Sequence, residues 1–185
     1  MLTDIEMTKT ERFEEMAVIH IDLIYNFVLH TLGREHDAQI LVQEIYIKAY
    51  KCFDDFDYET DCKLWLLKIT KETLVKFVLC NSNRLHTSSI SNMKSDIKTS
   101  DIDSEDYVVK AIHSLPTKCR MIVILADVEK LSYNEISYII GCPVKTVASK
   151  LRVSRQIIKR KLQNGFDRYC YQGRQSSEQE VFSCG

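Results

Sequence analysis

The chain has 185 residues with a formal net charge of −1, and it contains only 5 glycines and 2 prolines. A chain of this length forms one domain or two small ones, and the scarcity of glycine and proline disfavours a turn-rich β protein and predicts an all-helical fold. The sequence has no run as apolar as a membrane span, and the early acidic residues Asp4, Glu6 and Glu11 do not fit a signal peptide, so we expect a cytoplasmic protein.

Apolar side chains recur at helical spacing through the first part of the chain. This periodicity predicts helical segments from about Thr10 to Leu32, from about Asp37 to Phe53 and from Cys62 to about Asn81. Gly33 separates the first segment from the second, and an acidic loop over residues 54–61 precedes the third. We expect residues 10–85 to form one small helical domain, called the front module below.

Residues 86–106 are rich in Ser, Thr, Asp, Asn and Lys, and their few aliphatic side chains are widely spaced. Such a stretch buries too little apolar surface to order itself, which predicts a flexible linker. Helices are expected again from Tyr107 to Leu115 and, after Pro116, from Thr117 to about Val128. Residues 107–164 form the second predicted domain, the back module, and the tail over residues 165–185 is predicted to be disordered.

The back module contains the pattern of a helix-turn-helix. Ser132 and Glu135 have the spacing of a capping box, Gly141 suits the left-handed end of a helix, and Pro143 suits the start of the next one. From Val144 to Lys161 the chain then carries seven basic residues and no acidic one. A capped helix, a tight turn and a basic amphipathic helix predict a DNA-binding unit. The alternative is a solvated basic helix on any helical protein.

The near-zero net charge hides two halves of opposite sign. Residues 1–85 carry ten basic and fifteen acidic side chains, a net charge of −5. Residues 111–164 carry ten basic and three acidic side chains, a net charge of +7. This asymmetry indicates two modules with different partners, of which the basic one binds nucleic acid.

Motifs in both modules resemble the bacterial RNA polymerase sigma factors of the extracytoplasmic-function (ECF) subfamily. Residues 37–50 (DAQILVQEIYIKAY) resemble the helix by which that family docks on polymerase, and residues 64–70 (LWLLKIT) resemble its promoter-melting helix. In the back module the matching residues are Leu115, Pro116, Arg120, Val123, Leu125, Asp127, Val128, Glu129, Leu131, Ser132, Tyr133, Glu135, Ile136, Gly141, Pro143, Val144, Thr146, Val147, Ser149 and Leu151. The resemblance covers about residues 10–163, with both halves in the family's order.

This resemblance implies a monomeric factor that binds core RNA polymerase and promoter DNA and that an anti-sigma factor holds inactive. The implied polymerase contacts are Asp37, Gln43, Glu44, Tyr46, Ile47 and Lys48, with a merely solvated helix face as the alternative. The implied contacts to the promoter −10 element are Phe56, Tyr58, Lys68, Lys71 and Lys76. The expected contacts to the −35 element are Lys145, Thr146, Ser149, Lys150, Arg152, Arg155 and Lys159, the first five reading bases and the later ones holding phosphates.

Three points about the front module stay open at the level of sequence. Either Phe56 or Tyr58 captures a flipped-out base, because aromatic pockets read extruded bases, or one of them anchors the loop. Trp65 lies in an apolar run, which favours a core position over a base-stacking platform. Glu72 stands where the family usually has Asn. A carboxylate that faces DNA would be repelled by phosphate. Either Glu72 faces away from DNA, or this chain contacts its promoter differently from the family at this position.

No constellation for catalysis, metal or cofactor binding is predicted. The five histidines lack partners at ligand or triad spacing, the seven cysteines form no Cys-x-x-Cys pair, and no Gly-rich phosphate loop occurs. We therefore expect a protein that is not an enzyme and has no cofactor or small-molecule substrate. A stand-alone dimeric helix-turn-helix regulator is the rival hypothesis, and it predicts a palindromic site. A protein that binds polymerase without DNA would leave the +7 charge of the back module unexplained.

Overall fold

The computed structural model describes residues 7–81 and 104–181, with side chains described over residues 7–81 and 107–163. Throughout the described residues the regular structure is helical and contains no strand, which confirms the predicted all-helical class. The predicted linker falls largely on residues 82–103, which lie outside the described residues.

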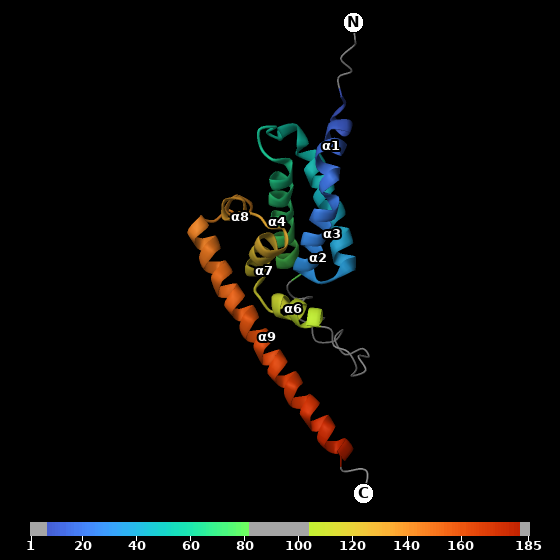
Figure 1. Ribbon diagram of the computed structural model, residues 1–185. Helices are drawn as coiled ribbons and strands as arrows, with labels where there is room; N and C mark the ends of the chain where they lie inside the picture. Colours follow the sequence, from blue (N-terminus) through green and yellow to red (C-terminus); the bar gives the residue numbers. More distant parts are fainter. Residues whose placement is uncertain (1–6, 82–103, 182–185) are drawn as a thin grey trace.

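The front module contains four α-helices (Figure 1) and two short 3₁₀ turns. Its elements are α1 (Lys9–Ala17), η1 (Val18–His20), α2 (Ile21–Leu32), α3 (Glu35–Lys51), η2 (Phe53–Asp55) and α4 (Cys62–Cys80). The segment predicted as one helix from Thr10 to Leu32 is therefore split by η1. The predicted break at Gly33 is confirmed, because this residue adopts φ +72° and its N–H donates to the carbonyl of Leu29 at 2.7 Å.

Side-chain caps mark the starts of two helices of the front module, α1 and α4. Thr8 and Glu11 form a reciprocal capping box on α1, and the Asp61 carboxylate accepts a hydrogen bond from the backbone N–H of Lys63 at 2.8 Å at the start of α4. The helices then bury one apolar stripe each around a common core. Its largest fully buried side chains are Phe27, Phe53, Ile24, Leu41, Ile45, Leu66, Leu67 and Leu74.

The back module contains α6 (Ser104–His113), α7 (Thr117–Val123), the π-helical turn η3 (Ile124–Val128), α8 (Tyr133–Ile140) and α9 (Val144–Val181). Helix α9 continues to Val181, where the sequence predicts a disordered tail from residue 165. Extending an existing helix needs no new nucleus, and the Arg, Gln and Glu residues of this segment are good helix formers. The polar composition of residues 165–181, which predicts disorder, is therefore compatible with a helix that begins upstream at Val144.

The two modules pack against each other (Figure 1). Helix α8 lies beside α4, and α7 together with η3 lies beside α2. Their apolar cores merge into one cluster, which joins Phe27, Leu41 and Leu66 of the front module to Met121 and Ile136 of the back module. Nothing in the sequence predicts this contact, because it depends on side chains from distant segments.

Candidate nucleic-acid and protein-binding surfaces

The helix-turn-helix forms as the sequence predicts. Ser132 caps α8 and forms a capping box with Glu135, and Gly141 ends α8 with φ +72°. The carbonyl of Pro143 accepts a hydrogen bond from the N–H of Thr146 at 2.8 Å. Helix α9 therefore begins directly after Pro143, at Val144. The turn therefore fixes the direction in which α9 leaves α8.

One face of α9 is buried and the opposite face is open. Val147, Leu151 and Ser154 are buried against the rest of the back module, whereas Val144, the first residue of α9, is exposed. The seven predicted −35 contacts lie on the outer surface: Lys145, Ser149, Arg152, Arg155 and Lys159 are exposed, and Thr146 and Lys150 are half-buried. The buried Ser154 is unexpected, because a hydroxyl inside an apolar stripe carries no periodicity signal.

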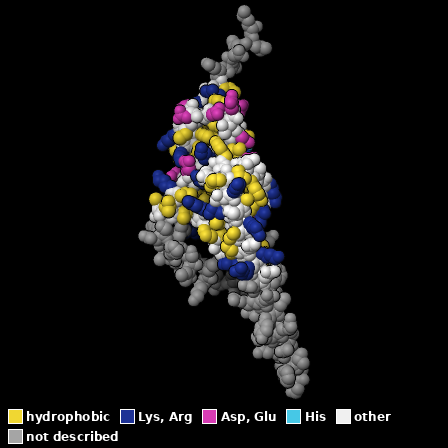
Figure 2. All heavy atoms as spheres, turned by 90° about the vertical axis from the view of Figure 1, so that its left-hand side faces the viewer, with side chains coloured by type: hydrophobic (Ala, Val, Ile, Leu, Met, Phe, Trp, Pro, Cys, Tyr) yellow, Lys and Arg dark blue, Asp and Glu magenta, His cyan; other side chains and the backbone are white. Residues whose placement is uncertain are grey.

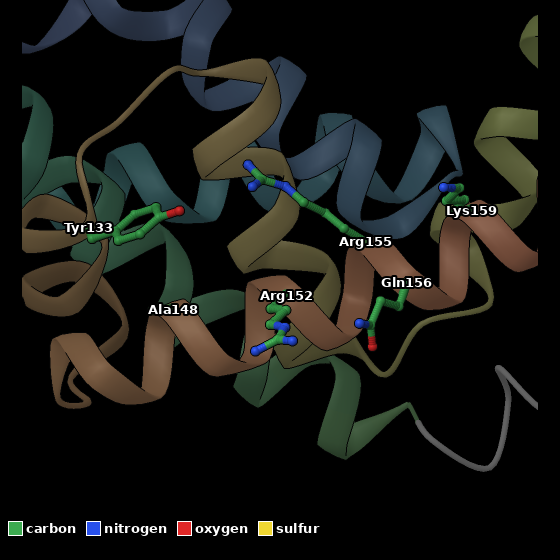
Figure 3. Close-up of a pocket in the computed structure, with 6 residues that line it drawn as sticks. All are labelled: Tyr133, Ala148, Arg152, Arg155, Gln156 and Lys159. Atoms are coloured by element: carbon green, nitrogen blue, oxygen red, sulfur yellow. The ribbon is translucent and has the colours of Figure 1, made fainter.

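A shallow hollow of about 300 Å³ opens on this face between α8 and α9 (Figure 3). Its lining residues are Tyr133, Ala148, Arg152, Arg155, Gln156 and Lys159. Tyr133 reaches in from the start of α8, while the other five come from α9. Three cations and a phenol around one hollow match the donors that hold phosphate oxygens in protein–DNA interfaces.

Arg155 is not free at this hollow. Its Nε donates to Asp127 Oδ2 at 3.3 Å, and its Nη2 donates to the other oxygen of the same carboxylate. This pairing with Asp127 is the main reason why the pKa of Arg155 is raised above its ordinary value. Asp127 therefore sets the position of Arg155 and competes with any phosphate for the same guanidinium.

The exposed face of α3 carries three of the six predicted polymerase contacts. Gln43 and Glu44 are exposed, and Ile47 keeps 57% of its surface accessible. Ile40, which is not among the polymerase contacts predicted from the sequence, is 49% exposed. It lies on the same face of α3, one turn before Gln43 and Glu44 and two turns before Ile47. Its spacing of seven from Ile47 is the signal that could have identified it.

Three other predicted polymerase contacts on α3 already have partners. Tyr46 is half-buried, and its hydroxyl donates to the carbonyl of Ala17 at 3.1 Å, while burial raises its pKa to about 12. Asp37 pairs with Arg34 at 2.8 Å, and Lys48 pairs with Glu72 at 3.2 Å. The structure thus makes Tyr46 a tie between α3 and α1 and leaves its hydroxyl no free role at the surface.

The aromatic residues of the acidic loop divide into an anchor and an open ring. Phe56 is 4% exposed and stacks on Phe53 with ring centroids 5.7 Å apart, and its centroid lies 4.9 Å from that of Trp65. Tyr58 is 55% exposed. Phe56 is therefore the loop anchor, Trp65 packs on the core as predicted, and Tyr58 is the aromatic ring available to a partner.

Basic side chains line α4 next to this loop. Lys68 and Lys76 are exposed, and Lys71 is half-buried. Glu72 pairs with Lys48 of α3. Of the two alternatives left open by the sequence, the structure therefore favours the one in which this carboxylate faces away from DNA. Figure 2 shows the resulting division of charge, with acidic side chains gathered towards the α1 end of the molecule and basic ones spread over the region of α8 and α9.

Comparisons with known proteins agree with this geometry. The family model of Sigma-70 region 2 matches residues 17–84, and that of Sigma-70, region 4 matches residues 105–157. The ECF RNA polymerase sigma-E factor of Escherichia coli K12 is 30% identical over 142 residues, which is 69% of this chain and 74% of that protein. The chain belongs to the ECF sigma factors.

Other relatives extend the match along the chain. The ECF RNA polymerase sigma factor SigW of Bacillus subtilis 168 is 26% identical over 170 residues, covering 83% of this chain and 90% of that protein. The sigma factor RpoE of Bartonella quintana, solved in complex with the anti-sigma factor NepR, has a TM-score of 0.64 at 22% identity and covers 82% of this chain and 97% of its own. CnrH, solved with the cytosolic domain of CnrY, has a TM-score of 0.61 at 18% identity.

Two further observations bear on this ECF sigma factor. Among the described residues no group of His, Cys, Asp or Glu is placed to hold a metal ion, and the cysteines there are free thiols. Cys62 is buried, and burial raises its pKa to about 11, which keeps the thiol protonated and unreactive. No helix in the described ranges has the length and apolarity needed to cross a membrane.

Proposed function

We propose that this ECF sigma factor directs core RNA polymerase to its promoters and has no catalytic chemistry of its own. The back module, residues 107–164, binds the −35 element through the outer face of α9. The front module, residues 10–85, binds polymerase through α3 and the −10 element through the acidic loop and α4. The observation that carries this proposal is the open basic face of α9, set directly after the capped helix α8.

The outer face of α9 supports two kinds of DNA contact. Lys145, Thr146 and Ser149 lie in its first turns, where side chains of a recognition helix reach base edges. Further along, Arg152 and Lys159 flank the hollow beside Tyr133 and suit a backbone phosphate, so we move Arg152 from the base contacts expected from the sequence to the phosphate contacts. Few base contacts give weak binding by the back module alone, and tethering to polymerase raises its effective concentration on the promoter.

The front module supplies the tether and the strand contact. Ile40, Gln43, Glu44 and Ile47 form an apolar and polar face on α3 that suits a protein partner. Tyr58 offers the open ring on which an unstacked base of the −10 element can lie. We also propose an anti-sigma partner, because the similar structure of the sigma factor RpoE was solved in complex with the anti-sigma factor NepR.

The test is run-off transcription with purified chain and bacterial core polymerase on promoters of the source genome. Arg152→Ala is expected to weaken −35 recognition and leave core binding intact, whereas Ile47→Glu is expected to weaken core binding and leave the DNA affinity of the back module intact. Light scattering is expected to give a monomer. Absence of both transcript and core binding would refute the sigma function, and a stable homodimer would favour the stand-alone regulator.

A further inference from the structure

Val153 is an apolar side chain on the face of α9 that is otherwise polar and basic. It keeps 53% of its surface exposed, whereas Leu151 and Ser154, close to it in the chain, are buried. Val153 stands four residues after Ser149 and seven after Thr146, and residues at these spacings share one face of a helix. The −35 contacts predicted from the sequence are all polar or charged and do not include Val153. This side chain therefore lies on the proposed DNA-reading face without an assigned role.

The strip formed by Thr146, Ser149 and Val153 offers DNA few hydrogen-bond donors. The Ser149 hydroxyl donates to the carbonyl of Thr146 at 3.1 Å, so its proton stays within the helix. Thr146 is half-buried, and the side chain of Val153 ends in two methyl groups. Helix periodicity places Arg152 on one side of this strip and Lys150 on the other. The cations at the sides suit phosphates, and the methyl groups between them suit an apolar part of the bases.

The apolar feature that the major groove offers is the C5-methyl group of thymine. Small methyl-bearing side chains such as Ala and Thr are its usual partners in protein–DNA complexes. Valine carries the γ-methyl of threonine and a second one in place of the hydroxyl. Its β-branched side chain has one strongly preferred rotamer in a helix, so the methyl groups of Val153 are held in place before DNA arrives.

The position of Val153 along α9 keeps it within reach of the bases. Four residues of α-helix, from Ser149 to Val153, span about 6 Å at about 1.5 Å per residue. Successive base pairs lie about 3.4 Å apart along the DNA axis. Val153 therefore stands about two base pairs beyond the position that Ser149 faces.

From these observations we infer that Val153 reads a thymine of the −35 element through its methyl groups. The contact sets the base preference at one position of the promoter. This inference rests on the proposed function of α9 as the −35 reader. The cations Lys150 and Arg152 on either side favour a DNA groove over a protein partner, because phosphates line the groove.

Removal of methyl groups from each partner in turn tests this contact. The holoenzyme, formed from the whole chain and bacterial core polymerase, first selects sequences from a DNA library with randomised −10 and −35 segments. Each thymine of the selected −35 segment is then replaced by uracil, which lacks only the C5-methyl group. Val153→Ala removes the methyl groups of the protein, and Val109→Ala, which trims a 50% exposed valine on α6, is the matched control. Competition binding with a labelled promoter measures the affinity of each holoenzyme.

We expect one thymine whose replacement by uracil weakens binding of the wild-type holoenzyme about fourfold, the effect of about one buried methyl group. Val153→Ala is expected to weaken binding to the thymine promoter by a similar factor and to bind the uracil promoter equally well. Its affinity for core polymerase should stay unchanged. Val109→Ala is expected to match wild type in every measurement.

Equal effects of uracil on wild type and on Val153→Ala would overturn the inference, as would a −35 segment in which no thymine responds to replacement. A loss of core affinity in Val153→Ala would also overturn it and make Val153 a contact to protein. If the wild-type holoenzyme selects no sequence at all, the proposed function itself is refuted, and the inference falls with it.

Discussion

The imidazole of His113 lies against the bare backbone of Gly33, so closely that a Cβ built on Gly33 would stand 2.5 Å from His113 Cε1. Gly33 also has φ +72°, where it ends α2. The same glycine therefore serves a local need, the left-handed turn, and a long-range one, the approach of α6 from the other module.

Replacement of Gly33 by Ala is expected to lower the free energy of unfolding by about 2–3 kcal/mol, because the left-handed backbone costs about 1–2 kcal/mol and the imidazole must move as well. Gly141→Ala is the matched control. It has the same φ of +72°, but its nearest neighbour would be the flexible end of Lys71 at 4.0 Å, so only the backbone cost remains. Equal losses in urea denaturation of the two variants would contradict a role for His113.

Acidification is expected to weaken the packing around His113. Burial, with the nearby charges of Arg120 and His30, lowers the pKa of this imidazole from 6.5 to about 4. The unfolded chain therefore binds the proton first, and stability present above pH 6.5 is lost as the pH falls towards 4. We expect a loss of about 1 kcal/mol between pH 7 and pH 5, less than the full shift because water screens a half-buried ring.

Glu129 affects the pH dependence of stability in the opposite direction over the same range, because burial raises the pKa of its carboxyl. The variant His113→Gln separates the contribution of the imidazole from that of Glu129. The measurement is the pH dependence of the free energy of unfolding for both chains. If wild type and His113→Gln have parallel profiles between pH 7 and pH 5, the imidazole does not contribute.

Substitution of the two aromatic residues of the acidic loop is expected to have different effects: one should lower stability and the other should lower the affinity for DNA. Phe56→Ala removes a buried ring that stacks on Phe53, so we expect a loss of about 3–5 kcal/mol in the free energy of unfolding. Tyr58→Ala removes an exposed ring, so stability should change by less than about 1 kcal/mol while the affinity for a −10 single strand falls. The opposite pattern would make Phe56 the contact and Tyr58 the anchor.

Asp127→Asn is expected to strengthen DNA binding by the chain about two- to fourfold at low salt, because the carboxylate that holds Arg155 loses its charge. The gain should shrink as salt is raised, since it is electrostatic. Asp22→Asn, on the exposed start of α2, is the control for the change in net charge. Weaker DNA binding by Asp127→Asn would show that Asp127 acts mainly by positioning Arg155 for DNA, and not by competing with phosphate for its guanidinium.

Local features were predictable because local sequence causes them. The capping box of Ser132 and Glu135, the left-handed turn at Gly141 and the open basic face of α9 follow from residues a few positions apart. The sequence alone therefore determined the all-helical class and the helix-turn-helix, and its motifs pointed to the sigma family. The extension of α9 beyond residue 165 was missed because composition does not report a helix propagated from upstream.

Only the tertiary structure decided which predicted site residues are available. It buried Phe56 and left Tyr58 open, used the hydroxyl of Tyr46 inside the front module, and paired Glu72 with Lys48. It also packed α8 on α4 and placed His113 against Gly33. Each of these contacts joins residues far apart in the chain, so its energy depends on the relative placement of whole helices, which periodicity and spacing along the sequence do not encode.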